Sequence, residues 1–187
     1  MKKIITSLLM LAAMFVSTSA WAAEYGVSVC GTKVTDSNKN NVTGSGISGT
    51  VTYDSSNQIL ILKNATLTPS SGYDGIYNQN IDGLSIQVEG TLTINVNSSA
   101  NNCAGIYCNA FTKIGANASA SPTININQTG VSYAIKSYGG ANIRLFRVTL
   151  NATASNNHAI FADSGANLTV YGSTSELKFE PPLYISK

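Results

Sequence analysis

Four residues that occupy one position of a repeated motif are the strongest candidates for ligand binding in this 187-residue chain. Tyr77, Tyr107, Lys136 and Phe161 each follow directly after an isoleucine that is preceded by Gly or Ala. If the isoleucines point inward, strand alternation turns the four side chains outward into one vertical column. Aromatic rings could stack on sugar rings, and the lysine could meet an acidic sugar. We therefore predict that this column binds a polysaccharide. The alternative is that stacked rings only stabilise the fold.

Residues suited to acid and base catalysis are sparse and scattered. Chemistry on a glycosidic bond needs carboxyl groups that converge on one point. Asp74 and His158 occupy equivalent positions in the first and last of four clear repeats, which places them about 14 Å apart. Asp163 shares its repeat position with no second carboxylate. No metal-ligand spacing, phosphate loop or nucleophile motif occurs. We therefore predict no catalytic residue, no metal ligand and no cofactor, and the balance is against an enzyme.

The candidate column depends on a repeat with a constant internal interval. Each motif isoleucine is followed by an aliphatic residue eight positions later: Ile76 and Leu84, Ile106 and Ile114, Ile135 and Ile143, Ile160 and Leu168. A further apolar pair completes each repeat: Leu92/Ile94, Ile124/Ile126, Val148/Leu150 and Leu177/Phe179. These runs alternate and have the length of strands, so each repeat predicts three short strands and no helix.

The repeats predict stacked coils. The eight-residue interval also relates Val51, Ile59 and Leu67, which gives five repeats of 25 to 30 residues. Units of this size bury their apolar faces against one another, with ladders of the motif isoleucines on one face and of Leu84, Ile114, Ile143 and Leu168 on the next. An antiparallel sandwich is the alternative, and Asp82-Gly83 is a hairpin signal in its favour. Later repeats lack that signal, which favours the parallel form.

The first 43 residues differ from the repeats. Residues 1–22 have two lysines, an apolar run and Ala20-Trp-Ala22, the pattern of a cleaved secretory signal. Residues 23–43 contain an alternating stretch with a turn at Gly31, which predicts a hairpin that caps the N-terminal end of the stack. Residues 44–187 then form the β-helix domain. The chain is therefore expected to be exported, as a secreted, cell-surface or periplasmic protein, without membrane insertion once the signal is removed.

Composition supports a polar β protein. Charged residues make up 11% of the chain, and after residue 22 nine basic residues face nine acidic ones. This balance argues against nucleic acid as a partner. Cys103 and Cys108 flank a strand and lie too far apart for a disulfide. Cys108 is expected to be a buried apolar residue, and a bridge between Cys30 and Cys103 is conceivable.

The repeated Gly-Ile-Tyr and Leu-x-Ile lines resemble the right-handed parallel β-helix superfamily, typified by pectate lyases. The lead-in from Tyr25 to Asn38, followed by residues 49–54 and 60–67, is similar to secreted β-helix proteins of Bacteroides-type gut bacteria, most of which lack an assigned activity. The resemblance covers about the whole chain after residue 22 and implies an all-β, right-handed parallel β-helix of about five coils. It transfers no functional residue. Calcium-dependent lyases of this fold use an acidic cluster beside a basic residue, and Arg144 and Arg147 lack such a cluster.

Two classes of function follow from these observations. The first is a secreted, non-catalytic surface or glycan-interaction module whose partner is a polysaccharide or a host or bacterial surface component. The alternative is a polysaccharide lyase or glycoside hydrolase that acts on an extended polysaccharide. A purely structural role, in which open coil ends join neighbours, is a third possibility.

Overall fold

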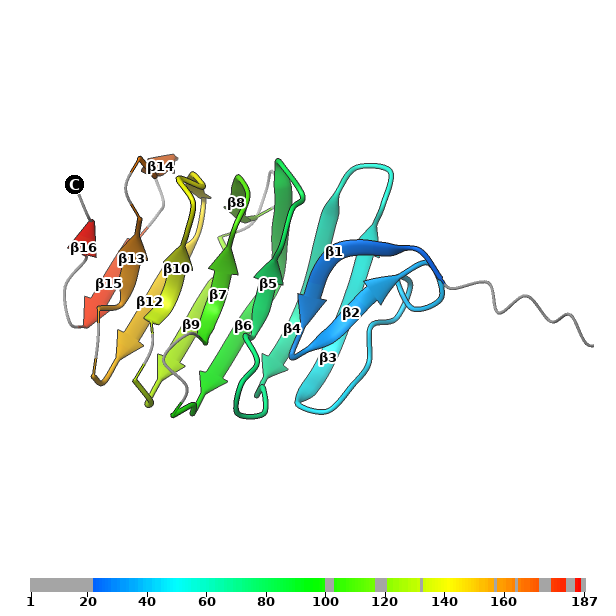
Figure 1. Cartoon of the computed structure of the whole chain (residues 1–187), viewed down its shortest axis with the longest axis horizontal. Coiled ribbons are helices and arrows are strands. Elements are labelled where there is room, and N and C mark those ends of the chain that lie inside the picture. The colour runs from blue at the N-terminus through cyan, green and yellow to red at the C-terminus, as the bar shows by residue number, and fades with distance from the viewer. Residues whose placement is uncertain are drawn as a thin grey trace, which may run out of the picture.

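The computed structural model describes residues 22–99, 103–116, 121–131, 133–156, 158–163, 165–171, 176–180 and 184–185. These residues form a parallel β-solenoid of about four turns with strands in mixed pairing at its N-terminal end (Figure 1). No helix that is long and apolar enough to cross a membrane occurs in this part of the chain. The signal segment expected for residues 1–22 lies outside it, apart from residue 22.

Each turn of the solenoid supplies strands to three faces. The first turn consists of β5 (Ile76–Asn78) and the long β6 (Leu84–Val96), whose two halves pair with different strands. The second turn consists of β7 (Ala104–Cys108), β8 (Thr112–Gly115) and β9 (Thr123–Gln128). The third turn consists of β10 (Tyr133–Ser137), β11 (Ile143–Phe146) and β12 (Thr149–Ala154). The fourth turn consists of β13 (Ile160–Ala162), β14 (Leu168–Tyr171) and β15 (Glu176–Glu180), and β16 (Tyr184–Ile185) follows beside β13.

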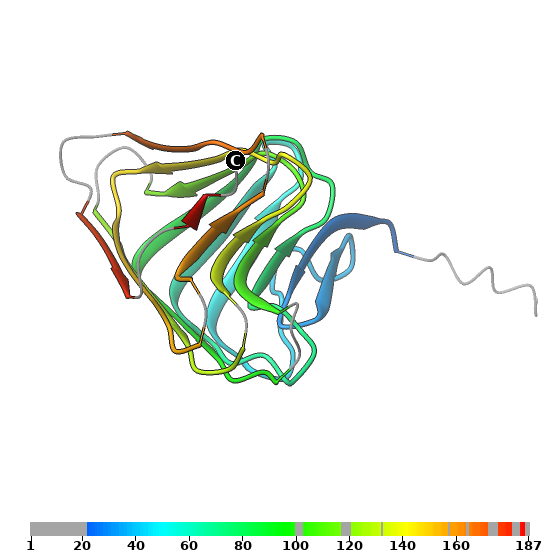
Figure 2. The same cartoon turned by 60° about the vertical axis from the view of Figure 1, so that its left-hand side comes forward.

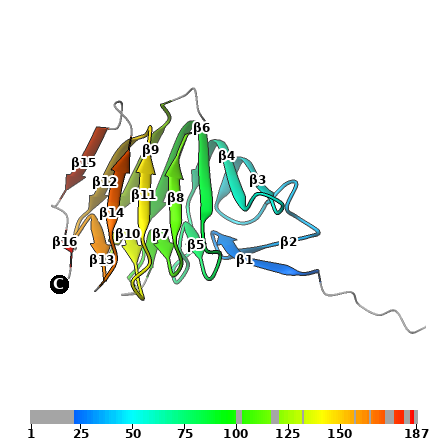
Figure 3. The ribbon, with the colours of Figure 1, turned by 90° about the horizontal axis from the view of Figure 1, so that it is seen from above.

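Equivalent strands of successive turns pair in parallel. The first face contains β5, β7, β10, β13 and β16. The second contains the first half of β6 with β8, β11 and β14, and the third contains its second half with β9, β12 and β15 (Figures 2 and 3). The body of the solenoid is therefore parallel, and the sandwich alternative is excluded.

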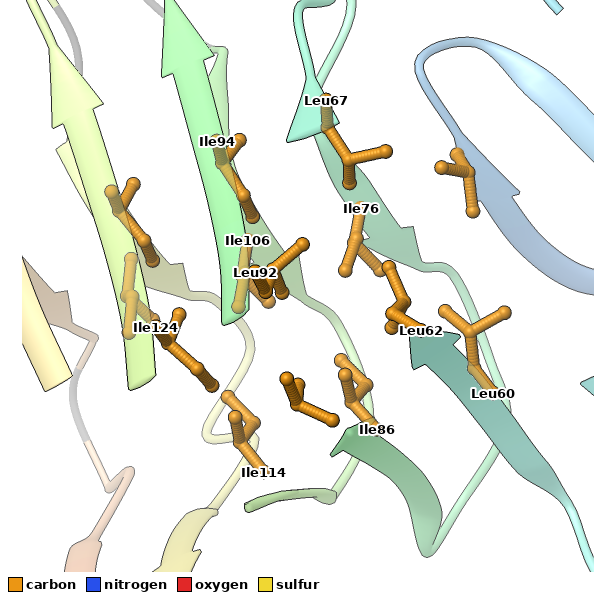
Figure 4. Close-up of a cluster of buried hydrophobic side chains, with 14 of the residues drawn as sticks. Leu60, Leu62, Leu67, Ile76, Ile86, Leu92, Ile94, Ile106, Ile114 and Ile124 are labelled. Carbon is orange, nitrogen blue, oxygen red and sulfur yellow. The ribbon is translucent and has the colours of Figure 1, made fainter. Parts of the chain in front are cut away.

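The predicted isoleucine ladder fills the interior behind the first face. Ile76, Ile106, Ile135 and Ile160 pair directly from turn to turn, and none has any exposed surface. Leu92 and Ile94 approach them from the third face (Figure 4). In-register stacking lets each turn bury its apolar side chains against the next, which confirms the inward direction inferred from the repeat.

The small residue before each isoleucine also points into the packed interior. A methyl group added at Gly105 would lie 2.3 Å from Cγ2 of Ile126 and 2.7 Å from the carbonyl oxygen of Ala134. One added at Gly75 would lie 2.5 Å from Cγ2 of Ile94. The first two turns therefore need Gly at this position because the first and third faces approach closely there, whereas the third and fourth turns bury Ala134 and Ala159 at the same position.

The second predicted ladder is wrong at one position. Leu84, Ile143 and Leu168 do align, but their partner in the second turn is Thr112 instead of Ile114. The corner before β8 is two residues shorter than its equivalents, so Ile114 aligns with Ile86 and Leu145 instead. Strand alternation tolerates a shift of two residues because the same face stays buried. The third apolar pair shifts in the same way: Leu150 and Ala152, not Val148 and Leu150, align with Ile124 and Ile126.

The first of the five expected coils is instead a hairpin. Strands β3 (Ile47–Asp54) and β4 (Ile59–Leu67) pair antiparallel, and β4 then pairs in parallel with β6. The carboxylate of Asp54 accepts hydrogen bonds from the backbone N–H groups of Ser56 and Asn57 and so stabilises the tight connection. The solenoid therefore has about four turns, and the hairpin provides the strand on which they stack.

The expected N-terminal hairpin forms at the edge of the first face. Strands β1 (Glu24–Val29) and β2 (Thr32–Thr35) pair antiparallel through a turn in which both Cys30 and Gly31 have positive φ. Strand β1 also pairs antiparallel with β5 and so covers the edge of the first turn. All three cysteines are buried and free, which excludes the Cys30–Cys103 bridge, and burial raises the pKa of the Cys108 thiol to about 12.

A buried asparagine holds the corner between the first two faces. The Asn78 side chain has no exposed surface; its amide donates to the carbonyl oxygen of Ile81 and to the hydroxyl of Thr112, each at 2.9 Å. Its carbonyl oxygen accepts the N–H of Ile81 at 2.9 Å. The side chain therefore satisfies the backbone of its own corner and ties it to the second turn.

Candidate functional site

The four predicted binding residues lie in one column on the outer side of the first face. Tyr77 pairs with Tyr107, Tyr107 with Lys136, and Lys136 with Phe161 in direct register. The rings of Tyr77 and Tyr107 have centres 5.1 Å apart and planes inclined by 34°. The amide of Asn109 donates a 2.8 Å hydrogen bond to the Tyr77 hydroxyl and fixes the ring on the turn below. The column predicted from the repeat is therefore confirmed as an arrangement of side chains.

Lys136 lies within the column and not above it. Only 7% of the residue is exposed. Its ammonium nitrogen lies 4.9 Å from the ring centre of Tyr107, 5.9 Å from that of Tyr133 and 5.7 Å from that of Tyr138. The negative faces of the rings attract the cation. A ligand would therefore meet these rings before it met the ammonium group.

The C-terminal part of the column is a ring stack. Phe161 and Tyr133 stack with centres 4.8 Å apart and planes 28° apart. Tyr138, at the end of the strand that carries Lys136, is 53% exposed. Aromatic surface therefore continues from the first turn to the fourth.

Asp74 is the carboxylate at the N-terminal end of the site. It precedes the first motif isoleucine by two residues, and Oδ1 accepts the N–H of Ala104 at 2.7 Å. Burial raises the pKa of Asp74 to about 6, against the opposing effects of that hydrogen bond and of the Lys136 charge. Burial and the Asp74 charge also raise the pKa of Tyr77. A carboxyl group with this pKa can both donate and accept hydrogen bonds near neutral pH.

A hollow of about 300 Å³ adjoins the N-terminal end of the column. Tyr73, Asp74 and Tyr77 line one side, and Ser28, Gly31 and Lys33 of the N-terminal hairpin line the other. The Tyr73 ring is 52% exposed and lies against Gly31, where an added methyl group would come within 2.6 Å of the ring. The hairpin therefore closes the edge of the sheet and also builds one wall of a concave site.

Two carboxylates act on the column, since after burial and the neighbouring Tyr77 the charges of Asp74 and Asp163 raise the pKa of Tyr107. No cluster of three His, Cys, Asp or Glu side chains suited to a metal ion lies among the described residues. The carboxylate of Asp163 lies at the far end of the site, where it accepts the N–H of Gly139 at 3.4 Å. The arrangement therefore offers ring faces, a carboxyl group at each end of the column and neighbouring amides.

Sequence reasoning missed Asp74, Tyr73, Tyr133 and Tyr138 as members of the site. The repeat positions relate Asp74 to His158 alone, as a catalytic pair. The predicted column consists of the residues that follow the motif isoleucines. Tyr73 and Asp74 precede the isoleucine, and the N-terminal hairpin supplies their surroundings. The signal in the sequence was the variation of the motif before its isoleucine: Tyr73 stands where other repeats have Cys, Ser or Asn, and Asp74 and Tyr133 stand where other repeats have Ala or His.

Comparisons with protein-family models, with curated proteins and with solved structures find no match to this chain.

Proposed function

We propose that the protein is a non-catalytic module that binds a polysaccharide along the column of Tyr77, Tyr107, Lys136 and Phe161 and in the adjoining hollow. The observation that carries this proposal is the continuity of the aromatic rings with a concave site. Tyr77 belongs both to the column and to the wall of the hollow that contains Tyr73 and Asp74. Ring faces for sugar stacking and a carboxyl group for sugar hydroxyls thus occur together.

The solenoid favours an extended ligand. Equivalent side chains recur on successive turns, about 4.8 Å apart, so one polymer could make similar contacts repeatedly. The rings are held by their neighbours, as Tyr77 is by Asn109, and little ordering is required on binding. In this proposal Lys136 supports the rings from within. The secretory signal pattern of residues 1–22 supports a place of action outside the cytoplasm, with a host or bacterial surface component as the source of the polysaccharide.

The proposal is tested by retention on a panel of insoluble neutral polysaccharides. The Tyr73→Ala variant and the Tyr77→Ala/Tyr107→Ala variant should both lose retention, because each removes a ring face. Tyr171→Ala on the second face is the matched control, since Tyr171 is 51% exposed and lies outside the column. The melting temperature of Tyr73→Ala should equal that of the parent, because Tyr73 is exposed whereas Tyr77 and Tyr107 are half-buried. Failure of the parent to bind any member of the panel would overturn the proposal.

Asp74 supports one alternative, a polysaccharide lyase or hydrolase. Its pKa of about 6 suits a group that exchanges a proton near neutral pH, and it faces the hollow. Incubation of the protein with the same panel distinguishes the two functions. New reducing ends or unsaturated products that disappear in Asp74→Asn would establish the enzyme, whereas retention without products supports the binding module.

A further inference from the structure

The second face of the solenoid, formed by the first half of β6 with β8, β11 and β14 (Figure 3), carries a second group of polar and aromatic residues. Lys113 on β8 and Arg144 on β11 are direct neighbours in register. Phe111 and Tyr171 accompany them: the guanidinium carbon of Arg144 lies 4.8 Å from the ring centre of Phe111 and 5.8 Å from that of Tyr171. We call these four residues the cationic patch.

The two cations of the patch have no acidic partner among the described residues. The three ion pairs found there involve other lysines, at positions 33, 39 and 63. The neighbours of Lys113 and Arg144 in the same column are Ser85 and Thr169, which are uncharged. Glu89, farther along β6, pairs with Lys63 at 2.7 Å. Like charges on adjacent rungs repel each other, so their juxtaposition is unfavourable unless an anion is bound.

Aromatic contacts hold the cations in place. Phe111 lies near both, since the Lys113 nitrogen is 5.9 Å from its ring centre. A guanidinium group that stacks on rings keeps its N–H edges available for acceptors. The rings therefore orient Arg144 without neutralising it, and this lowers the cost of ordering the side chain when an anion binds.

We propose that the cationic patch binds sulfate groups of a sulfated polysaccharide. The three terminal oxygens of one sulfate ester can accept hydrogen bonds from Arg144 and Lys113 together, because the two residues lie on adjacent rungs. Nucleic acid fits less well, since phosphate binding depends on many cations and the chain after residue 22 has nine basic and nine acidic residues. The proposal does not depend on the tyrosine column, which lies on the first face.

Binding of the full chain to immobilised dextran sulfate, with unmodified dextran as the matched polymer, tests this proposal. The parent should bind dextran sulfate and not dextran. Lys113→Gln/Arg144→Gln should weaken binding at least about tenfold. Arg144→Lys, which keeps the charge but loses the planar group, should have an intermediate effect. Raising NaCl from about 0.1 M to about 1 M shortens the screening length from about 10 Å to about 3 Å and should release the parent.

The control is Lys178→Gln, which removes one exposed positive charge from β15 on the third face. It should bind dextran sulfate like the parent, and so should Tyr77→Ala/Tyr107→Ala, whose defect concerns the other site. Equal losses in Lys178→Gln and in the double patch variant would show unspecific charge attraction and overturn the proposal. Tighter binding to polygalacturonate or to a single-stranded oligonucleotide would overturn it in favour of a carboxylate polymer or a nucleic acid.

Discussion

The ammonium nitrogen of Lys136 lies 4.9 Å from the centre of the Tyr107 ring, one turn of the solenoid away. The same cation acts on Asp74, whose pKa it lowers. A largely buried cation is thus stabilised jointly by rings and by a carboxylate of the first turn. This relationship links the stability of the site to its charge state.

Replacing Lys136 with Met should lower stability at pH 7 and less so at pH 4. Met keeps the apolar stem but loses the cation–π contacts, which contribute about 1–2 kcal/mol when partly desolvated. At pH 7 the Asp74 carboxylate also loses its positive neighbour, so its pKa should rise further. Urea unfolding at the two pH values measures both effects. An equal loss at both pH values would contradict the link to Asp74.

The unfolding free energy of the parent, relative to that of the Asp74→Asn variant, should be higher at mildly acidic pH than at neutral pH. The pKa of Asp74 in the folded protein is about 6, above its ordinary value of about 4. The folded state therefore holds the proton more tightly, and this stabilisation is complete below about pH 4 and lost as the pH rises through 6. The difference in unfolding free energy between the parent and Asp74→Asn should change by about 2 kcal/mol across that range. Asp36 and Asp54, whose pKa values are lowered by hydrogen bonds, act in the opposite direction but are present in both proteins.

Asn78→Ala should destabilise the protein by about 2–4 kcal/mol, because it leaves the buried N–H of Ile81 without its acceptor. Thr112→Val should cost less, since it leaves the Ile81 N–H paired and removes only the bonds of the Thr112 hydroxyl, which accepts from the Asn78 amide and donates to the carbonyl oxygen of Ala110. Gln79→Ala, at an exposed neighbouring position, is the control. Chemical denaturation of the three variants gives the comparison, and a loss below about 1 kcal/mol for Asn78→Ala would contradict the role assigned to this corner.

Gly105→Ala should cost about 1–3 kcal/mol through overpacking. The added methyl group meets Ile126 and the backbone of Ala134, which cannot move away without disturbing the paired strands. Ser155→Thr adds a methyl group at an exposed position and should leave the melting temperature almost unchanged. A Gly105→Ala variant as stable as the parent would show that the first and third faces are less tightly packed than their contacts imply.

Much of the fold was predictable because a parallel stack repeats its sequence pattern. The isoleucine ladder follows from Ile76, Ile106, Ile135 and Ile160 alone, since each occupies the same place in its turn. The partner of Leu84 was not predictable in the same way. An interval of eight residues is preserved at Ile114, yet a corner shorter by two residues places Thr112 there instead.

The predicted number of turns was wrong for a related reason. The alternation of apolar and polar residues in positions 47–67 is the same whether the two strands belong to a coil or to a hairpin. The local signal for the hairpin was the polar connection from Asp54 to Asn57, in which the Asp side chain bonds the backbone two and three residues later.

The column of the candidate site was predictable from spacing, but its surroundings were not. Whether Lys136 points to solvent or lies among rings depends on Tyr133 and Tyr138, which precede and follow Lys136 at different distances in the sequence. The hollow needs the N-terminal hairpin beside Tyr73, and that contact joins segments about forty residues apart in the sequence. Such contacts leave no periodic signal.

The in-register stacking of whole turns has a consequence for how such a chain can change in evolution. Because each turn pairs only with the turns before and after it, an internal duplication of residues 106–134 would insert one complete coil with its own isoleucine, corner and outward side chain. The outward column would then lengthen by one rung of about 4.8 Å while the hairpin and the hollow stayed unchanged. The length of polymer that the face could engage would therefore be set by gene length in whole-coil steps.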